Sequence, residues 1–278
     1  MFKLPMKINS YYQSINGQQE QHPSINNRGL AYGDGVFTTA KVLNGNVQFL
    51  SAHIERLTIS CSKLNISLPD FNKMIIEITD EAKKYELSVV KIIITVGDGG
   101  RGYSRQGCSS SNVIITFHGF PEHYLLLQQK GIHLGVSTLK IGINPLTAGI
   151  KHLNRLEQVL IREELDNRNE DDLLVLNYFD YVIEATAANV FWYKNNTWHT
   201  PKLDESGVEG LMRNQIIQNC SNHFEINLIN AKLSALDSIE AMFICNSVMG
   251  VIPVRQFENQ ILSLAPCHDI KALMQHVM

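Results

Sequence analysis

The sequence predicts a mixed α/β (α+β) fold with two domains, a smaller N-terminal domain over residues 1–120 and a larger, sheet-rich C-terminal domain over residues 121–278. Two observations predict it. Helical and strand periodicities alternate along the first part of the chain, whereas β-branched runs crowd together in the second part. A chain of 278 residues is also long enough to bury the core of one large domain or of two smaller ones.

The N-terminal domain is expected to contain a β-hairpin, two helices and two further strands. Asn44-Gly45 is typical of a hairpin turn. Ser51 is predicted to be a helix N-cap, because apolar residues recur at helical spacing after it. Residues 11–27 are polar and are expected to form a loop. The predicted strands are 36–43, 46–50, 89–96 and 112–117, and the predicted helices are one that starts after Ser51 and one over 70–84.

In the C-terminal domain, strands outnumber helices. Residues 121–129 are predicted to connect the two domains, and Lys151 falls in a turn between a strand and a helix. The predicted strands are 132–139, 173–177, 181–186, 190–193, 241–244 and 251–257, and the predicted helices are 153–165 and one that starts after Gly210.

Composition and charge exclude several classes of protein. A formal net charge of -3 gives no basic footprint for nucleic acid. The cysteines are scattered without a C-x-x-C pair, which argues against a zinc site or a disulfide framework and favours a reducing compartment. The N-terminus lacks the apolar run of a signal peptide, and no segment approaches the roughly 18 apolar residues of a membrane span. We therefore expect a cytoplasmic protein that binds no metal.

Lys151 lies in a glycine-flanked turn directly before a helical segment. The preceding residues 144–148 are poor helix and strand formers, so Lys151 is expected at a loop-to-helix junction. A lysine that is partly desolvated there has a lowered pKa and exposes a nucleophilic amine for Schiff-base chemistry. The alternative is an ordinary solvated surface lysine. A pyridoxal phosphate enzyme needs such a lysine, an acidic partner for the ring nitrogen and an anion cradle for the phosphate.

Glu184 is the candidate partner for the ring nitrogen. It follows the apolar strand residues 181–183 and precedes a run of small residues, which would let a flat ring approach closely. A carboxylate paired with the ring nitrogen keeps that nitrogen protonated. The alternative is a strand-end glutamate that faces water.

The candidate phosphate cradle has three parts. Gly210 immediately precedes a predicted helix, whose free backbone N–H groups at Leu211 and Met212 can bind an anion. Ser247 follows a strand and offers a hydroxyl, and Arg56 on the first predicted helix offers a positive charge. Taken singly, these features also fit a helix cap, a strand-end serine and a surface arginine.

In combination, these segments resemble the class IV aminotransferase family, the fold type IV pyridoxal phosphate enzymes that include D-amino acid and branched-chain aminotransferases. The resemblance spans nearly the whole chain in the family's order. It implies that Lys151 holds pyridoxal 5'-phosphate, that Glu184 contacts the ring nitrogen, and that the phosphate is bound by further residues. The matching segments are 32–37, 51–57, 151–154, 184–191 and 207–213, and the implied phosphate ligands are Arg56, Leu211, Met212 and Ser247.

Within the family, two markers resemble the lyases rather than the aminotransferases. The loop 99–104 is similar to the lyases' substrate loop, in which Arg101 would hold a substrate carboxylate bidentately. Thr39 follows Phe37 where aminotransferases commonly carry Glu-Gly, and its hydroxyl could assist proton movement as a catalytic group. Without the resemblance, these residues would be an exposed arginine and a strand threonine. One departure is Asn27, where relatives usually have an aspartate before the arginine.

The lyase resemblance implies conversion of 4-amino-4-deoxychorismate to 4-aminobenzoate and pyruvate, a step of folate biosynthesis. It also implies a homodimer whose site lies between the two domains and near the partner subunit. A branched-chain or D-amino acid aminotransferase with the same cofactor remains the nearer alternative, and a non-enzymatic binding protein with this fold is the more distant one.

Overall fold

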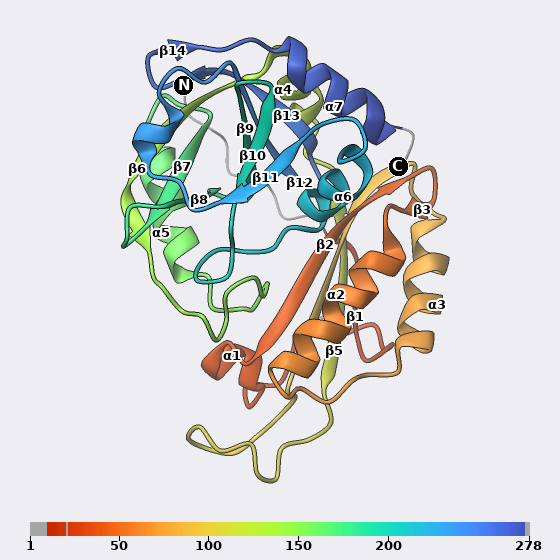
Figure 1. Ribbon diagram of the computed structural model, residues 1–278. Helices are drawn as coiled ribbons and strands as arrows, with labels where there is room; N and C mark the ends of the chain where they lie inside the picture. Colours follow the sequence, from red (N-terminus) through yellow and green to blue (C-terminus); the bar gives the residue numbers. More distant parts are fainter. Residues whose placement is uncertain (1–9, 21, 276–278) are drawn as a thin grey trace. The chain divides into compact units, whose positions relative to one another are not determined.

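The computed structural model describes residues 10–20 and 22–275, and these form two compact units (Figure 1). The first unit holds the described residues up to Pro121 together with His152–Asn154. The second unit holds Glu122–Lys151 and the described residues from Arg155 onward. The chain therefore leaves the second unit after Lys151, contributes His152–Asn154 to the first unit, and returns to the second unit at Arg155.

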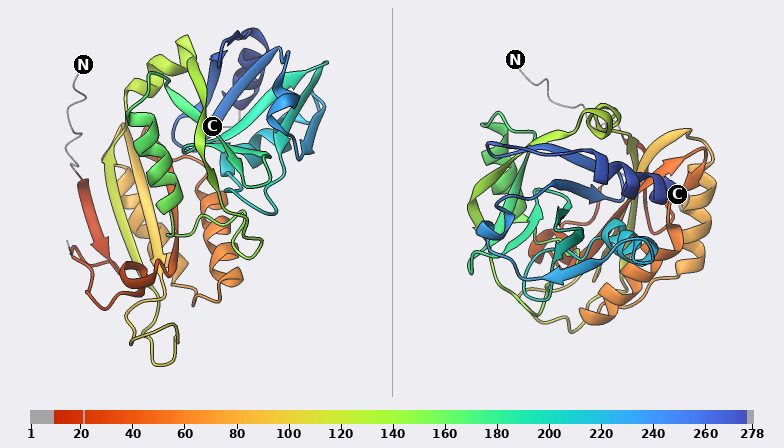
Figure 2. Two further views of the ribbon diagram at one scale, coloured as in Figure 1. Left: turned by 90° about the vertical axis from the view of Figure 1, so that its left-hand side faces the viewer. Right: turned by 45° about the horizontal axis from the view of Figure 1, so that its top comes forward.

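The first unit is a five-stranded antiparallel sheet in the order β1-β5-β4-β2-β3. Helices α2 and α3 lie on one face of this sheet in Figures 1 and 2. The strands are β1 (Ser10–Ile15), β2 (Gly35–Leu43), β3 (Asn46–Val47), β4 (Leu87–Thr95) and β5 (Asn112–Gly119), and the helices are α1 (Arg28–Tyr32), α2 (Leu50–Lys63) and α3 (Phe71–Ala82).

Side chains along β2 point alternately to the two faces of the sheet, and their burial shows which of them face the helices. Val36, Thr38, Ala40 and Val42 are buried, while the residues between them are partly exposed. The buried set lies on the α2 side, because the Thr38 hydroxyl is 2.6 Å from Nδ1 of His53 on α2. Thr39 consequently points to the opposite face of the sheet.

Several predictions for this unit are confirmed and three are wrong. The predicted hairpin is present, with positive φ at both Asn44 and Gly45 as a two-residue turn requires. Ser51 is not an N-cap, because α2 begins one residue earlier and Phe49 occupies the cap position with a φ of 55°. The return strand is therefore shorter than predicted. Part of the expected loop 11–27 instead forms β1, which pairs with β5, and α1 was not predicted.

The second unit is built on a nine-stranded mixed sheet in the order β11-β10-β9-β12-β13-β6-β7-β8, with β14 paired to β13. The predicted connection 121–129 contains helix α4. The strands are β6 (Ile132–Ile141), β7 (Asp172–Asn177), β8 (Val182–Ala185), β9 (Asn189–Lys194), β10 (Thr197–Pro201), β11 (Ile226–Ile229), β12 (Ala241–Asn246), β13 (Gly250–Phe257) and β14 (Gln260–Ile261). The helices are α4 (His123–Lys130), α5 (Leu156–Asp166), α6 (Leu211–Cys220), α7 (Ala265–Gln275) and the 3₁₀ helix η1 (Leu233–Leu236).

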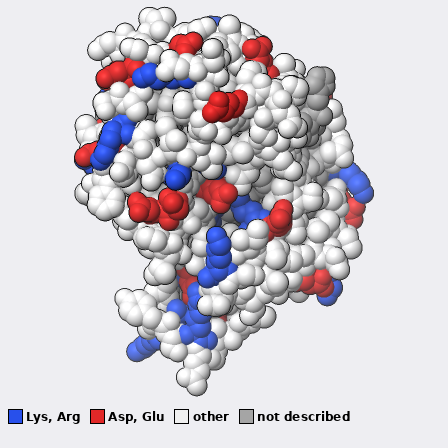
Figure 3. All heavy atoms as spheres, viewed as in Figure 1, with Lys and Arg blue, Asp and Glu red and all other residues white. Residues whose placement is uncertain are grey.

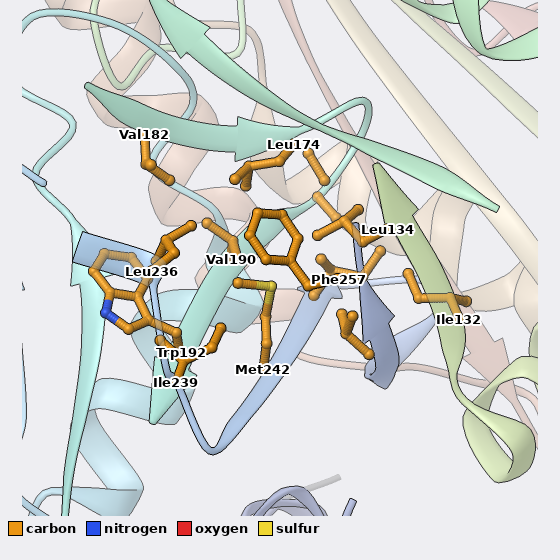
Figure 4. Close-up of a cluster of buried hydrophobic side chains, with 14 of the residues drawn as sticks. Ile132, Leu134, Leu174, Val182, Val190, Trp192, Leu236, Ile239, Met242 and Phe257 are labelled. Atoms are coloured by element: carbon orange, nitrogen blue, oxygen red, sulfur yellow. The ribbon is translucent and has the colours of Figure 1, made fainter. Parts of the chain in front are cut away.

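The core of this unit joins strands that are distant in the sequence. Trp192 on β9, Met242 on β12 and Phe257 on β13 lie in one buried cluster with Leu134 on β6 (Figure 4). Burying side chains of this size stabilises a fold by roughly 1.5–3 kcal/mol each. The cluster therefore fixes β8, β9 and β12, whose ends supply the candidate site.

Two further observations concern the charges on the surface and the apolarity of the helices. Lysine, arginine, aspartate and glutamate are interspersed on the face drawn in Figure 3. Within residues 10–20 and 22–275, no helix combines the length and apolarity that a bilayer crossing would need.

Candidate active site

The Lys151 turn is hydrogen-bonded to the loop before α6. The Gly149 N–H donates to the Gly207 carbonyl at 3.0 Å, and the Glu209 N–H donates to the Gly149 carbonyl at 3.1 Å. These two bonds form a short parallel bridge between Gly149 and Val208. The residues predicted to carry the reactive amine and those predicted to bind phosphate are thus joined through their main chains.

Glu184 is attached to the same loop. Its side chain, near the end of β8, is buried, and Oε2 accepts a 2.9 Å hydrogen bond from the Val208 N–H. Burial raises the pKa of this carboxyl, and the Val208 bond and the charges of Arg155 and Lys151 only partly oppose that rise. Lys151 therefore lies close enough for its charge to act on the Glu184 carboxylate.

Gln158 on α5 completes the surroundings of Glu184. Its Nε2 is 3.4 Å from Glu184 Oε1, while its own Oε1 is buried without a hydrogen-bond partner among the described residues. A buried carboxylate with a raised pKa and an unpaired amide oxygen beside it would both gain from a cationic N–H group. The protonated ring nitrogen of pyridoxal phosphate is such a group, so these residues fit it.

The N-terminus of α6 fits an anion. Gly210 occupies the cap position, and the helix has no side-chain cap hydrogen bond. A Cβ at Gly210 would lie 1.7 Å from Oδ1 of Asn189, so only glycine allows this approach. Asn189 in turn donates from Nδ2 to the Val208 carbonyl at 2.8 Å. Leu211 and Met212 follow as buried residues whose backbone N–H groups open the helix.

Ser247 lies at the end of β12, where Asn246 shapes the turn. The Asn246 side chain donates to the Ala187 carbonyl at 3.0 Å and accepts from the N–H groups of Val248 and Met249. Cys245 is paired with Asn189 in the sheet, so Ser247 follows the strand that borders Asn189. In the second unit, hydrogen bonds therefore join the Lys151 turn and Glu184 to the loop that precedes Leu211 and Met212, and Ser247 follows the strand next to Asn189.

The remaining predicted residues belong to the first unit. Thr39 lies on β2 opposite Lys91 of β4, and Arg56 lies on α2 one turn after His53. Burial, together with the nearby Arg56 charge, lowers the pKa of His53 to about 3. His53 is consequently neutral and contacts the Thr38 hydroxyl on the face of β2 opposite to Thr39. Arg101 is exposed in the loop between β4 and β5, which extends beyond the end of the sheet (Figure 2).

Three residues around these groups were not predicted from the sequence. Gln158 on α5 and Arg155 at its N-cap lie near Glu184, and Lys91 faces the same side of the sheet as Thr39. Helical spacing after Lys151 could have drawn attention to Arg155 and Gln158, which lie one turn apart. Lys91 is evident only from the strand register.

Comparison with known proteins decides the family. Residues 35–257 match the model of the amino-transferase class IV family. The chain belongs to this family. It is 38% identical to an aminodeoxychorismate lyase of Vibrio harveyi over 241 residues, which cover 86% of this chain and 89% of that protein.

Solved structures show the same architecture. A 4-amino-4-deoxychorismate lyase from Pseudomonas aeruginosa superposes with a TM-score of 0.88 at 29% identity, covering 95% of this chain and 97% of that one. A hypothetical aminotransferase from Mycobacterium tuberculosis in its PLP-bound form gives a TM-score of 0.84 at 15% identity, covering 96% and 98%. The second likeness shows the fold alone. The predicted mixed α/β fold of type IV is confirmed.

Proposed function

We propose that this protein is a pyridoxal phosphate-dependent lyase that converts 4-amino-4-deoxychorismate to 4-aminobenzoate and pyruvate in folate biosynthesis. The observation that carries the proposal is the 38% identity to the Vibrio harveyi aminodeoxychorismate lyase over 86% of the chain. The bonded arrangement of Lys151, Glu184 and the loop before α6 supports the cofactor half of the proposal.

The cofactor is assigned to residues whose chemistry matches its parts. Lys151 would hold the aldehyde carbon, and Glu184 would pair with the ring nitrogen. The N–H groups of Leu211 and Met212, the Ser247 hydroxyl and the Arg56 guanidinium would bind the phosphate. When bound, pyridoxal phosphate supplies an electron sink conjugated to the amine-bearing carbon of the substrate.

Lys151 would supply the base for this reaction, and Glu184 would supply the negative charge. Once the substrate amine has taken its place on the cofactor, the freed Lys151 amine would remove the proton from C4 of the substrate, a general-base contribution that is typically worth about 10²–10⁴ in rate. Glu184 holds a negative charge beside the ring nitrogen, and its burial keeps water from screening that charge. Loss of the enolpyruvyl group from C3 then completes an aromatic ring, which makes the elimination strongly favourable.

Substrate recognition is assigned to the first unit. Arg101 would bind a substrate carboxylate through two parallel N–H bonds, which its planar guanidinium allows. Thr39 would place its hydroxyl near the reacting carbons. His53 fixes the neighbouring Thr38 from the opposite side of β2, and this contact holds the strand that carries Thr39.

A homodimer is proposed on family resemblance and on an apolar face of α5. Val159 and Leu160 lie one turn after Leu156 on this helix, and the three side chains are 59%, 46% and 70% exposed, respectively. A partner subunit would cover such a face. Sedimentation velocity at micromolar concentration is expected to give a dimer.

The boundary between folding domains near residue 120 and a cytoplasmic location are proposed on the sequence alone.

The decisive experiment supplies enzymatically generated aminodeoxychorismate to the purified protein and follows 4-aminobenzoate by fluorescence. Production of 4-aminobenzoate together with stoichiometric pyruvate is expected. D- and L-amino acid/keto acid pairs run in parallel test the aminotransferase alternative. Transamination without 4-aminobenzoate formation would overturn the lyase proposal and leave the cofactor assignment intact.

A further inference from the structure

We propose that Arg28, Asp34 and Arg105 form an arginine clamp that positions Arg101 for the substrate carboxylate. The clamp holds the loop 97–109, called the arginine loop, in one conformation. Arg28 and its partners would be positioning residues, because they act on Arg101 through the main chain that follows it. This inference rests on the proposed substrate-binding role of Arg101.

Arg28 donates hydrogen bonds to three consecutive residues of the arginine loop. Its side chain is only 3% exposed. Nη1 donates to the carbonyls of Gly102 at 3.1 Å and Ser104 at 3.3 Å, and Nη2 donates to the carbonyl of Tyr103 at 3.3 Å. Guanidinium is the side-chain group with enough fixed donors to hold three carbonyls at once. The segment directly after Arg101 is therefore fixed through its main chain.

Asp34 links Arg28 to Arg105 at the far end of the loop. Arg28 Nε donates to Asp34 Oδ2 at 2.9 Å, and Arg105 Nε donates to the same oxygen at 3.0 Å. Burial opposes ionisation of Asp34, but the hydrogen bonds from Arg105 and Arg28 outweigh it and hold the pKa of this carboxyl below its usual value. Asp34 thus stays ionised and joins both arginines at neutral pH.

The clamp is anchored to the elements that carry other proposed site residues. Arg105 Nη1 donates to the Leu64 carbonyl at 2.6 Å, at the end of the helix that bears Arg56. Asp34 directly precedes β2, the strand that bears Thr39. The arginine loop is consequently tied to both α2 and β2 within the first unit.

Contacts before and after Arg101 narrow the freedom of the loop further. A Cβ at Gly99 would lie 2.8 Å from Cδ of Arg28, so the loop packs closely on the arginine stem at this position. The Gly102 N–H donates to the Tyr32 hydroxyl at 2.9 Å, and the Arg28 guanidinium lies 4.6 Å from the centre of the Tyr32 ring.

The composition of the loop explains why a clamp is needed. Glycines at 97, 99, 100, 102 and 107 give this segment more backbone freedom than other residues would. An arginine that served only the stability of the unit would bond to the sheet and helices. Arg28 instead directs three bonds to an exposed loop whose tip carries Arg101, and these bonds determine where that side chain stands.

The test compares Arg28→Gln with the wild-type holoenzyme. We expect kcat/KM for aminodeoxychorismate to fall about tenfold to a hundredfold, mainly through KM, with the affinity for pyridoxal phosphate unchanged. Arg28→Lys should lie between the two. The matched control is Arg162→Gln, which removes an exposed arginine paired with Asp166 on α5 and should behave as wild type.

A double variant separates positioning from general stability. If Arg28 acts through Arg101, adding Arg28→Gln to Arg101→Ala should cause no further loss of kcat/KM. Full additivity, or wild-type kinetics in both Arg28 variants, would overturn the proposal.

Hydrogen exchange provides a measurement that does not depend on activity. Arg28→Gln should speed amide exchange in residues 99–104 and leave β2 and β4 protected as in wild type. Arg105→Gln and Tyr32→Phe serve the same purpose if Arg28→Gln does not fold. Unchanged exchange in the loop would refute the clamp even in an active lyase. Absence of lyase activity in the wild type would refute the proposed function, and the exchange experiment would still decide whether the clamp orders the loop.

Discussion

Residues 142–151, which end in Lys151, and the arginine loop are held in different ways. The lysine segment is bonded to the loop before α6 by main-chain groups, including the pair between Gly149 and Gly207. The arginine loop has main-chain bonds near its ends, such as that from the Gly99 N–H to the Asn26 carbonyl, but the part that follows Arg101 is held by the side chains of Arg28, Asp34 and Tyr32. Main-chain bonds do not depend on which side chains are present, whereas the side-chain contacts are lost with one substitution.

Because of this difference, we expect substitutions to affect cofactor chemistry and substrate recognition separately in the proposed enzyme. The cofactor-binding segments should keep their shape when individual side chains change, so their variants should lose chemistry and retain the fold. The arginine loop should change shape with its supporting side chains, so variants there should alter substrate recognition and retain the cofactor. The following predictions test this separation, from the largest expected effect to the smallest.

Lys151→Ala should lose turnover by at least about 10²–10⁴, the usual value of a general base. The melting temperature of the apoprotein should stay near that of wild type, because the bonds of Gly149 remain. Borohydride reduction of the wild-type holoenzyme should fix the cofactor on a peptide that contains Lys151, as read by mass spectrometry. Label on another lysine would contradict the assignment.

Glu184→Gln should lose most turnover, on the order of 10²-fold, while it still binds cofactor. The amide oxygen can accept the Val208 N–H as the carboxylate does, but an amide cannot keep the ring nitrogen protonated. Steady-state kinetics and the visible absorption spectrum check both parts. Near wild-type turnover would show that Glu184 has only a structural role.

Arg101→Ala should lower kcat/KM for aminodeoxychorismate by roughly 10- to 100-fold, because a charge-assisted contact of this kind is worth about 1.5–3 kcal/mol. The cofactor spectrum should not change. Arg101→Lys should recover part of the loss, since an ammonium lacks the planar fork. Wild-type parameters in both variants would show that Arg101 does not bind substrate, and the lyase proposal would then rest on Thr39 and on the 38% identity to the Vibrio harveyi lyase.

The pH dependence of apoprotein stability should reveal the burial of Glu184. Its pKa is raised by burial, so the folded state holds this proton more tightly than the unfolded chain does. Stability is therefore lost as pH rises above about 4.3, the unperturbed value of a glutamate, towards the folded pKa. Replacing the carboxyl by an amide removes this loss.

Calorimetry at two pH values checks that prediction. The melting temperature of Glu184→Gln relative to wild type should be higher at pH 8 than at pH 4. Lys83→Gln, which removes an exposed lysine paired with Asp80, serves as the control, with the same difference at both values. An equal difference for Glu184→Gln at the two pH values would contradict a raised pKa.

Local patterns predicted the parts of the site that depend on neighbouring residues. Glycines around Lys151, the apolar strand before Glu184 and the glycine before α6 are visible in short stretches of sequence. Contacts between distant residues were not predicted. Gln158 meets Glu184 across 26 residues, and Arg28 meets Gly102 across 74 residues.

The wrong local predictions also have physical causes. Ser51 has the side chain of an N-cap, but a second turn after β3 contains Phe49 in a left-handed conformation, and the helix starts before the serine. Residues 10–15 read as polar because β1 is an edge strand. Asn27, which departs from the family resemblance, caps α1 because its side chain accepts the Gly29 N–H, as an aspartate could.

The three residues between Lys151 and Arg155 constrain how this chain can be recombined with its relatives. The Leu153 N–H donates to the Gly35 carbonyl, and the Asn154 side chain donates to the Gly33 carbonyl. A chimera that exchanges only the chain up to Pro121 would pair these two donors with a foreign strand. An exchange that also carries His152–Asn154 would keep the native partners together, so crossover points for shuffled libraries belong on either side of this short segment as well as after Pro121.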